Sequence, residues 1–268
     1  PSLSRKSDGL PTGAVNGFCS MLFKLLEEAR SDESNYKPTH FAVIFDAARK
    51  NFRNDIYKEY KANRTEAPED LVPQFEYIRK SVKAFNLPSI ELPNYEADDL
   101  IATYAKQIIK AGAKVTVISS DKDFIQLHGF HVKQYSPVSK KLVNDTSPLE
   151  YLREHIIKGD RSDGVPNVLS PDDTFTESKR QKPIRKTMLI TLTEAMDKWE
   201  PKDLFQLAKC NRDTWVRNWQ RNETLIDLDK IPQDIRDEIL REFNNAPTGD
   251  RSKLFNYFVE KKLNNLIQ

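Results

Sequence analysis

The chain has little of what a disulfide framework, a membrane span or a zinc site requires. It contains two cysteines, Cys19 and Cys210, which lie far apart in the sequence. We therefore expect two reduced thiols, as in a cytoplasmic protein, and not a disulfide framework or a zinc site. No apolar run approaches the ~20 residues that cross a membrane. The opening PSLSRKSDGLPTG forms neither a signal peptide nor a transit sequence.

Net charge says little about partners, since it is only +2. The cations are unevenly distributed, however. A first group comprises Lys50, Arg53, Lys58, Lys61 and Arg64, and a second comprises Lys179, Arg180, Lys182, Arg185 and Lys186. Such groups most often form a solvated face, and they are also what a phosphate backbone requires. From charge alone, both interpretations stay open.

Hydrophobic periodicity predicts strands that alternate with helices in the first part of the chain. Residues 13–28 and 71–85 carry apolar side chains at three- and four-residue steps, which is typical of helices. Residues 40–45 and 114–120 are apolar runs of strand length, and a helix over 96–111 should lie between them. This order predicts an α/β fold with a mostly parallel central sheet flanked by helices.

Composition changes near residue 145, and beyond it we find helices and polar loops but no convincing strand. Ser147 to Glu150 match a capping box with proline at the first helical position, so a helix should begin there. The polar and basic composition of residues 169–181 predicts an exposed, mobile loop. Pro232 should open another helix, and residues 254–266 should form an amphipathic tail helix.

A chain of 268 residues can hold one large domain or two small ones. We place an α/β region at residues 1–145 and a helical region at residues 146–268, packed as one unit.

Acidic residues recur where an open α/β sheet binds ligands, at the carboxyl ends of its strands. The set comprises Asp46, Glu96, Asp98, Asp99, Asp121, Asp123, Asp160 and Asp163. So many carboxylates around one site repel one another unless cations neutralise them. Oxygen ligands without a nearby histidine or cysteine select hard ions such as Mg²⁺ or Mn²⁺ over Zn²⁺. We interpret the histidines as structural or surface residues; they are His40, His128, His131 and His155.

Plainer interpretations exist for each acidic group taken alone. Acidic residues at a helix N-terminus stabilise the helix dipole by ~0.3–1 kcal/mol without a metal. A single Asp after a strand is usually a turn residue. The repetition of such groups along the chain favours a shared metal site. Two ions held there would activate a water for attack on phosphorus and stabilise the leaving oxygen, so phosphodiester hydrolysis is the natural reaction.

Several segments resemble the motifs of the 5′ nuclease superfamily, which includes the 5′ nuclease domain of bacterial DNA polymerase I, the flap endonucleases and the T-even phage ribonuclease H. The four consecutive motifs are FDAARKNFRNDIYKEYKANR (45–64), YEADDL (95–100), SSDKDF (119–124) and IKGDRSDGVP (157–166). The opening GLPTGAVNGF (9–18) is similar to the polymerase branch. The segments most similar to the phage ribonuclease H, the closest match overall, are RKTMLITLTEA (185–195), NETLIDLDKIPQDI (222–235) and LFNYFVEKKLNNL (254–266).

The resemblance implies a PIN-like 5′ nuclease fold. Its catalytic region would be residues 1–145 with a helical arch over about 46–86, and residues 146–268 would bind duplex DNA. The acidic set would correspond to the family's ligands for two Mg²⁺ or Mn²⁺ ions.

Four residues of the first basic group and its surroundings match the arch of the family. Lys61 would stabilise charge developing in the transition state, and Arg64 would clamp phosphate with its planar fork. Tyr60 would offer a ring for a base to stack on, and Arg53 would face the same channel. For Lys61 and Arg64 the alternative is a solvated helix cation, and for Tyr60 it is packing in the core.

The sequence departs from the family pattern in two places. The family begins with a strand that carries one further metal-binding Asp, and Asp8 does not replace it because no strand precedes it. We expect that strand to precede Pro1 in the complete protein, since losing a central strand would leave two sheet edges unpaired. The other reading is a truncated and impaired chain.

The second departure follows Gly164, where polymerase-type members carry a glycine-rich turn that binds duplex phosphates with a potassium ion. The stretch here lacks that glycine pattern, which argues against bound potassium. We expect a longer, disordered connector whose cations contact duplex phosphates; they are Lys179, Arg180, Lys182, Arg185 and Lys186.

The resemblance implies a divalent-metal-dependent 5′→3′ exonuclease and flap endonuclease that removes RNA primers and 5′ flaps during DNA replication. Its partners would be branched or flapped DNA and RNA–DNA duplexes, with a single-strand-binding protein or a clamp as candidate protein partners and no membrane. It would be phage-encoded and act in the bacterial cytoplasm. One alternative is a non-catalytic, structure-specific nucleic-acid-binding module of the same fold. Another, a phosphatase with an aspartyl nucleophile, explains neither the basic arch segment nor the acidic pair in GDRSDG.

Overall fold

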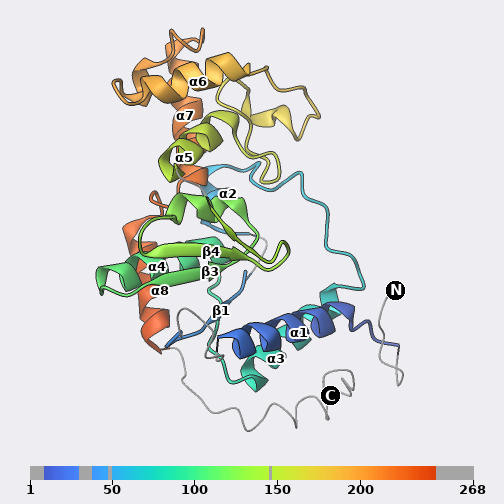
Figure 1. Ribbon diagram of the computed structural model, residues 1–268. Helices are drawn as coiled ribbons and strands as arrows, with labels where there is room; N and C mark the ends of the chain where they lie inside the picture. Colours follow the sequence, from blue (N-terminus) through green and yellow to red (C-terminus); the bar gives the residue numbers. More distant parts are fainter. Residues whose placement is uncertain (1–8, 30–37, 48–49, 145–146, 246–268) are drawn as a thin grey trace. The chain divides into compact units, whose positions relative to one another are not determined.

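The computed structural model describes residues 9–29, 38–47, 50–144 and 147–245 (Figure 1). The described residues fall into two compact units, each built from segments that are distant in the sequence. One unit takes in residues of Pro1–Phe45, Glu66–Glu91 and Glu242–Gln268, and the other those of Asp46–Thr65 and Leu92–Arg241. The predicted division into functional regions near residue 145 stays a prediction.

The first unit pairs two helices with a short parallel ribbon. Helix α1 (Gly13–Glu28) has the predicted bounds, and α3 (Val72–Ala84) lies beside it (Figure 1). Strands β1 (Val43–Ile44) and β2 (Ser89–Ile90) pair in parallel. Apolar residues on one face of α1 and the end of α3 form the core; they include Val15, Cys19, Leu22, Leu26, Val82 and Phe85.

The second unit holds a three-stranded sheet in the order β3-β4-β5. Strand β3 (Val115–Ile118) pairs in parallel with β4 (Val132–Ser136), and β5 (Lys141–Val143) adds an antiparallel edge. Helix α4 (Ala97–Lys110) and the 3₁₀ helix η1 (Lys122–Leu127) pack on this sheet. The predicted α/β fold with parallel pairing is therefore confirmed, with short strands and an antiparallel edge that the sequence analysis did not include.

Helices dominate the rest of the second unit, and no described residue after 147 belongs to a strand. The elements are α2 (Phe52–Ile56), α5 (Pro148–Lys158), η2 (Asp172–Thr174), α6 (Lys186–Ala195), η3 (Pro201–Asp203), α7 (Arg212–Ile226) and α8 (Gln233–Asn245). As predicted, α5 begins at Pro148 and α8 begins directly after Pro232. A core centred on Trp215 joins α5, α6 and α7. The predicted tail helix at 254–266 lies outside the described residues.

The prediction of an exposed, mobile loop over residues 169–181 is wrong for its first half. Ser170 and Thr174 are buried there, and side chains of α7 bind the chain around them. Asn218 Nδ2 donates to the carbonyls of Val168, at 2.9 Å, and Ser170, at 3.1 Å. These amide groups satisfy backbone carbonyls that would otherwise need water, so the segment can be buried without losing hydrogen bonds. Residues 176–180 are exposed.

Among the helices that the structure describes, none has the length and apolar character needed to cross a membrane.

Candidate active site

All eight predicted metal-binding carboxylates lie in the second unit, on segments that converge. Asp46 follows β1, and its Oδ1 accepts a hydrogen bond from the backbone N–H of Ala97, at 2.7 Å, where α4 begins. Glu96 and Asp98 stand at that same helix start, and Asp121 and Asp123 follow β3. The remaining pair, Asp160 and Asp163, follows helix α5. The other three groups come after β1, β2 and β3 in the chain.

Five of these carboxylates lie around one small pocket; its acidic lining is Glu96, Asp98, Asp123, Asp160 and Asp163. Their mutual repulsion is visible at Asp98. Burial, and then the charges of Asp121, Glu96, Asp123 and Asp46, raise the pKa of Asp98 well above its ordinary value. A cluster of this kind favours the binding of cations, because a cation removes the repulsion.

The pair Asp123 and Asp160 is held by a histidine. His155 on α5 places Nδ1 3.6 Å from Asp123 Oδ1 and Nε2 3.4 Å from Asp160 Oδ2. Burial and the neighbouring carboxylates, led by Asp121, raise the pKa of Asp123 to about 7 although His155 opposes them. Burial acts against ionisation of Asp160 too, but hydrogen bonds from His155 and Ser162 hold the pKa of Asp160 below its usual range. The pKa of His155 is raised: burial opposes this, and Asp160 and Asp123 outweigh it.

The interpretation of His155 as a structural or surface residue therefore missed a member of the site. Asp123, His155 and Asp160 each offer a ligand atom, and these atoms lie within 4.8 Å of one another. The sequence held one usable signal. His155 lies in the last turn of a helix that leads directly into the acidic GDRSDG segment, so it had to lie near that segment.

Two glycines give the GDRSDG turn its shape. Gly159 and Gly164 both have positive φ, 68° and 72°. A Cβ at Gly164 would lie 2.8 Å from Asn63 Oδ1 and 3.0 Å from the carbonyl oxygen of Glu59, so only glycine lets the turn approach the 59–63 segment. This approach brings the basic arch residues to the carboxylates.

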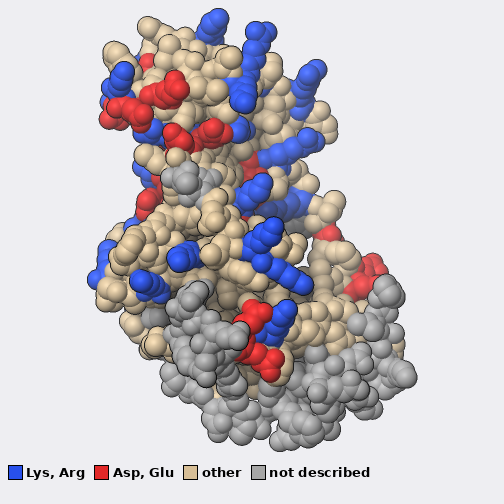
Figure 2. Space-filling view, in the orientation of Figure 1, with Lys and Arg blue, Asp and Glu red and all other residues tan. Residues whose placement is uncertain are grey.

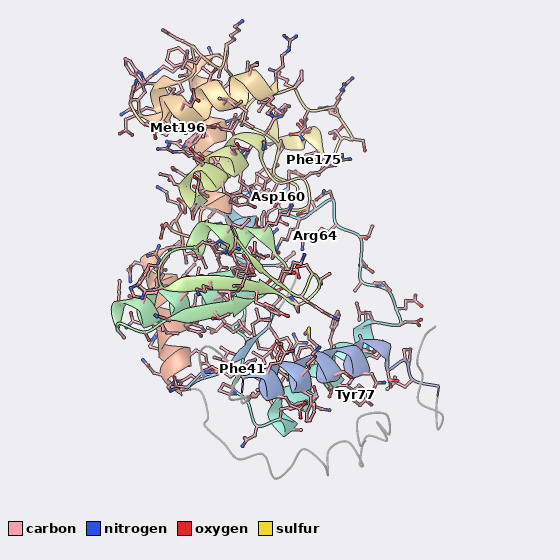
Figure 3. All side chains as sticks on the ribbon, viewed as in Figure 1. Phe41, Arg64, Tyr77, Asp160, Phe175 and Met196 are labelled. Carbon is pink, nitrogen blue, oxygen red and sulfur yellow. The ribbon has the colours of Figure 1, made fainter. Side chains whose placement is uncertain are left out.

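Lys61 and Arg64 pair with carboxylates of the acidic cluster, and their predicted roles toward phosphate stay predictions. Lys61 Nζ pairs with Glu96 Oε1 and lies 3.6 Å from Asp163 Oδ2, and its backbone N–H donates to the Asp163 carbonyl. Arg64 pairs with Asp163 Oδ1 and donates from Nε to the Ser162 carbonyl, at 3.0 Å. The side chain of Arg64 is half exposed, and Figure 3 shows it close to Asp160.

Tyr60 does not present its ring for stacking. It is 3% exposed, and its O–H lies 2.9 Å from Glu96 Oε2 and 2.8 Å from Asp163 Oδ2. One O–H thus bridges two carboxylates from different segments. Burial raises the pKa of the Tyr60 hydroxyl far above its ordinary value, so it stays a hydrogen-bond donor. The geometry favours core packing, the alternative to base stacking that the sequence left open.

Arg53 also differs from its predicted role in the nucleic-acid channel. It is 2% exposed and makes a bidentate pair with Asp99, which is 0% exposed. Its Nε donates to the carbonyl of Leu225, at 3.1 Å, and Nη1 lies 3.5 Å from Glu96 Oε2. Asp99 Oδ2 also accepts from the backbone N–H of Glu96, at 3.0 Å. The oxygens of Asp99 are therefore already used, and Asp99 stands behind the metal-binding candidates and not among them.

The second basic group lies elsewhere, along the connector and the start of α6. Its members are exposed; they are Lys179, Arg180, Lys182, Arg185 and Lys186. Lys179 pairs with Asp173, at 2.5 Å. Figure 2 shows Lys and Arg side chains spread over the part of this face where α6 lies. The group forms a basic surface and contributes nothing to the acidic pocket.

The donor set fits hard divalent cations. Carboxylate oxygens, the donors that such ions prefer, come together from four segments, and Asp46 and Asp121 are exposed to solvent. Among the described residues, His155 is the histidine that lies with these carboxylates, beside Asp123 and Asp160.

The comparisons with known proteins agree with this site. Residues 1–155 match the family described as "5′-3′ exonuclease, N-terminal resolvase-like domain". The chain belongs to this family, whose members are nucleases, hydrolases of phosphodiester bonds. Residues 147–268 match a second description, "T4 RNase H, C terminal". The predicted resemblance to the 5′ nucleases, with a phage ribonuclease H-like second half, is confirmed.

The chain spans no more than about a fifth of the length of the DNA polymerase I relatives that it matches. DNA polymerase I of Rhizobium leguminosarum is 48% identical over 176 residues, which cover 63% of this chain and 17% of that protein. A 5′-3′ exonuclease of Aquifex aeolicus (strain VF5) is 35% identical over 184 residues, which cover 63% of this chain and 58% of that protein.

Solved structures share the fold at low sequence identity. The T5 flap endonuclease in a complex with DNA and metal ions has a TM-score of 0.61 and 20% identity, covering 86% of this chain and 89% of that one. The T5 5′-exonuclease with zinc bound has a TM-score of 0.59 and 20% identity, covering 86% and 90%. These likenesses show the 5′ nuclease fold.

Proposed function

We propose that this chain is a divalent-metal-dependent 5′ nuclease that acts as a 5′→3′ exonuclease and flap endonuclease on DNA, and that it removes RNA primers and 5′ flaps during replication. One observation carries the proposal: carboxylates from three segments line one pocket, and Lys61 and Arg64 pair with carboxylates of that lining. A solved structure with the same fold supports the proposal: the T5 flap endonuclease was crystallised in a complex with DNA and metal ions.

The residues divide into holders of the ions and holders of the phosphate. Asp46, Asp98 and Asp121, with the pair Asp123 and Asp160, would hold two Mg²⁺ or Mn²⁺ ions. When bound, such ions activate water at neutral pH and stabilise the oxygen that leaves phosphorus. The Asp99–Arg53 pair would fix the start of α4, and so keep Glu96 and Asp98 in place.

Lys61 and Arg64 supply the positive charge that the phosphate needs. Lys61 is 14% exposed on its side chain and already lies against Glu96 and Asp163, so its charge is positioned beside the metal-binding candidates. It would stabilise the charge that develops on the phosphate oxygens. Arg64, with its half-exposed guanidinium, would bind a phosphate oxygen through its planar fork.

The basic surface on the connector and α6 would bind the phosphates of the duplex. Each phosphate that a cation neutralises releases counterions, which makes the affinity depend on salt. Duplex binding should be measured from about 50 to 200 mM salt for the wild type and for the triple change Lys179→Gln, Arg180→Gln, Lys182→Gln. A shallower slope of log affinity against log salt is expected, and an unchanged slope would remove these residues from the interface.

A single-strand-binding protein or a clamp as partner, phage origin and a place in the bacterial cytoplasm stay predictions.

The decisive experiment uses a 5′-flap duplex with a labelled flap strand. Cleavage should require Mg²⁺, stop with EDTA, and be lost in Asp121→Asn. The matched control is Asp203→Asn, which changes an exposed carboxylate in η3, outside the acidic pocket. Cleavage in EDTA, or full activity of Asp121→Asn, would refute the metal-dependent mechanism. Flap binding by the wild type without cleavage in Mg²⁺ would establish the non-catalytic binding module instead.

A further inference from the structure

We propose that His155 is a direct ligand of one of the divalent ions, and that it makes the position at Asp123 and Asp160 selective for borderline transition-metal ions such as Co²⁺ and Zn²⁺. This inference rests on the proposed function, since it assigns a further residue to the same metal site. The other position, at Asp46 and Asp98, has oxygen donors and would keep a preference for Mg²⁺.

The distances around the ring favour shared coordination. His155 Nε2 lies 3.4 Å from Asp160 Oδ2, whereas Asp123 Oδ1 lies 3.6 Å from the other ring nitrogen, Nδ1. Two donor atoms bound to one ion at about 2.1 Å, at a tetrahedral angle, lie ~3.4 Å apart. Nε2 and Asp160 Oδ2 are therefore spaced as two donors on one ion, and Asp123 offers a further carboxylate oxygen in a group of ligand atoms that lie within 4.8 Å of one another.

The hydrogen bonds of the neighbours leave the right atoms available. Asp160 Oδ1 accepts from Ser162 N and Ser162 Oγ, both at 2.7 Å, and from Asp163 N, at 3.2 Å. Its other oxygen, Oδ2, is the one that faces His155. On the far side of the ring, His155 Nδ1 lies 3.2 Å from the hydroxyl of Tyr151.

Tyr151 therefore orients the imidazole. When one ring nitrogen bonds a neighbour, the tautomer is fixed and the other nitrogen carries the lone pair for a metal. The Tyr151 ring also meets the imidazole edge-on, with centroids 5.6 Å apart, which restricts its rotation. Tyr151 thus holds the imidazole in the orientation in which Nε2 faces Asp160 Oδ2. His155, Asp123 and Asp160 are each partly buried, so the ligands are pre-positioned and still reachable.

Imidazole changes which ion this position prefers. Carboxylate and water suit Mg²⁺, whereas an imidazole nitrogen suits Zn²⁺ and other first-row transition metals. We expect the loss of His155 to weaken Zn²⁺ or Co²⁺ binding by at least about 10-fold, while Mg²⁺ binding at the all-oxygen position changes much less.

The test measures metal binding directly on the full, untagged chain. Calorimetric titrations with Zn²⁺, Co²⁺ and Mg²⁺ would compare the wild type, His155→Gln and the control His40→Gln, which changes an exposed histidine of the first unit. Selective loss of Zn²⁺ and Co²⁺ affinity in His155→Gln is the expected result. Unchanged affinity would overturn the proposal. A gain in affinity would also overturn it, because it would mean that a charged imidazolium competes with the metal.

A second measurement does not depend on the variant folding. The chain has four histidines, so a ¹⁵N-histidine-labelled sample gives a small spectrum. Zn²⁺ should shift the ring nitrogens of His155 at one equivalent and leave those of His40 in place. If the His155 signals do not move, the ligand assignment is wrong.

Failure of the inference and failure of the proposed function give different results. If the chain cleaves flaps in Mg²⁺ but Zn²⁺ does not shift the His155 signals, the nuclease function stands and His155 is not a metal ligand. If Zn²⁺ binds through His155 but the chain does not cleave flaps with any metal ion, His155 is a metal ligand and the proposed nuclease function is wrong.

Discussion

Replacing Arg53 with methionine should unfold the second unit more easily without touching a nucleic-acid contact. The guanidinium is 2% exposed and holds both oxygens of Asp99, which is 0% exposed. Removing one partner of a buried pair leaves the other charge unpaired, which typically costs about 3–5 kcal/mol. That is a large share of the ~5–15 kcal/mol that stabilises a folded domain.

The cost should be visible in urea unfolding followed by tryptophan fluorescence. Trp215 and Trp219 are buried in the same unit, so their emission reports its unfolding. With a slope of ~3 kcal/mol per molar urea, the midpoint should fall by about 1–2 M in Arg53→Met. The double change Arg53→Met with Asp99→Leu should recover part of the loss, because no unpaired charge remains.

A matched control and a binding assay separate this structural role from the predicted contact with nucleic acid. Arg212→Met removes an exposed arginine at the start of α7 and should leave the midpoint unchanged. If Arg53→Met instead weakened flap binding and left the urea midpoint in place, Arg53 would face the substrate and the reasoning from burial would be refuted.

Three further changes test the site and its supports. Lys61→Met should lower single-turnover flap cleavage by about 10²–10³-fold with little loss of duplex binding; equal losses in both would make Lys61 a binding residue only. Gly164→Ala should lower the melting temperature, because it adds backbone strain of about 1–3 kcal/mol beside Asn63. Gly129→Ala, where a Cβ meets nothing within 4 Å, is its control. Burial raises the pKa of the Cys19 thiol to about 11, so a disulfide reagent near pH 8 should modify only Cys210 in the folded protein. Because the unfolded thiol ionises at lower pH, stability should fall as pH rises toward 11, and rapid labelling of both thiols at pH 8 would contradict this.

The sequence predicted the elements whose signals are local. The bounds of α1 follow from an amphipathic repeat, and α5 follows from proline after a serine. The meeting of the acidic groups was also predictable, because the carboxyl ends of parallel strands share an edge. Strand β4 was missed since its sequence VKQYS is largely polar. Its Gln134 is buried because Nε2 donates to the carbonyls of Ser119 and Asp121, which no local pattern reveals.

The roles that the sequence misassigned depend on contacts between distant segments. Arg53 belongs to a group of cations that the sequence alone does not distinguish. In the structure it is buried and paired with Asp99, whereas Lys58 is exposed. Tyr60 reaches Asp163 from far along the chain. The sequence shows how many charged residues lie near a site. Which of them is buried depends on whether the fold brings a residue of opposite charge next to it.

One distinction was nevertheless available from helix geometry. Successive residues of a helix point about 100° apart, so the neighbours Asp98 and Asp99 in YEADDL cannot face the same ion. Residues three apart share a face, which groups Asp99 with Glu96 and leaves Asp98 alone. In the structure Arg53 makes a bidentate pair with Asp99 and lies near Glu96, whereas the charges of Asp121, Glu96 and Asp123 raise the pKa of Asp98. In an acidic motif that opens a helix, the periodicity of the helix therefore assigns one carboxylate to the metal side and its neighbour to the scaffold.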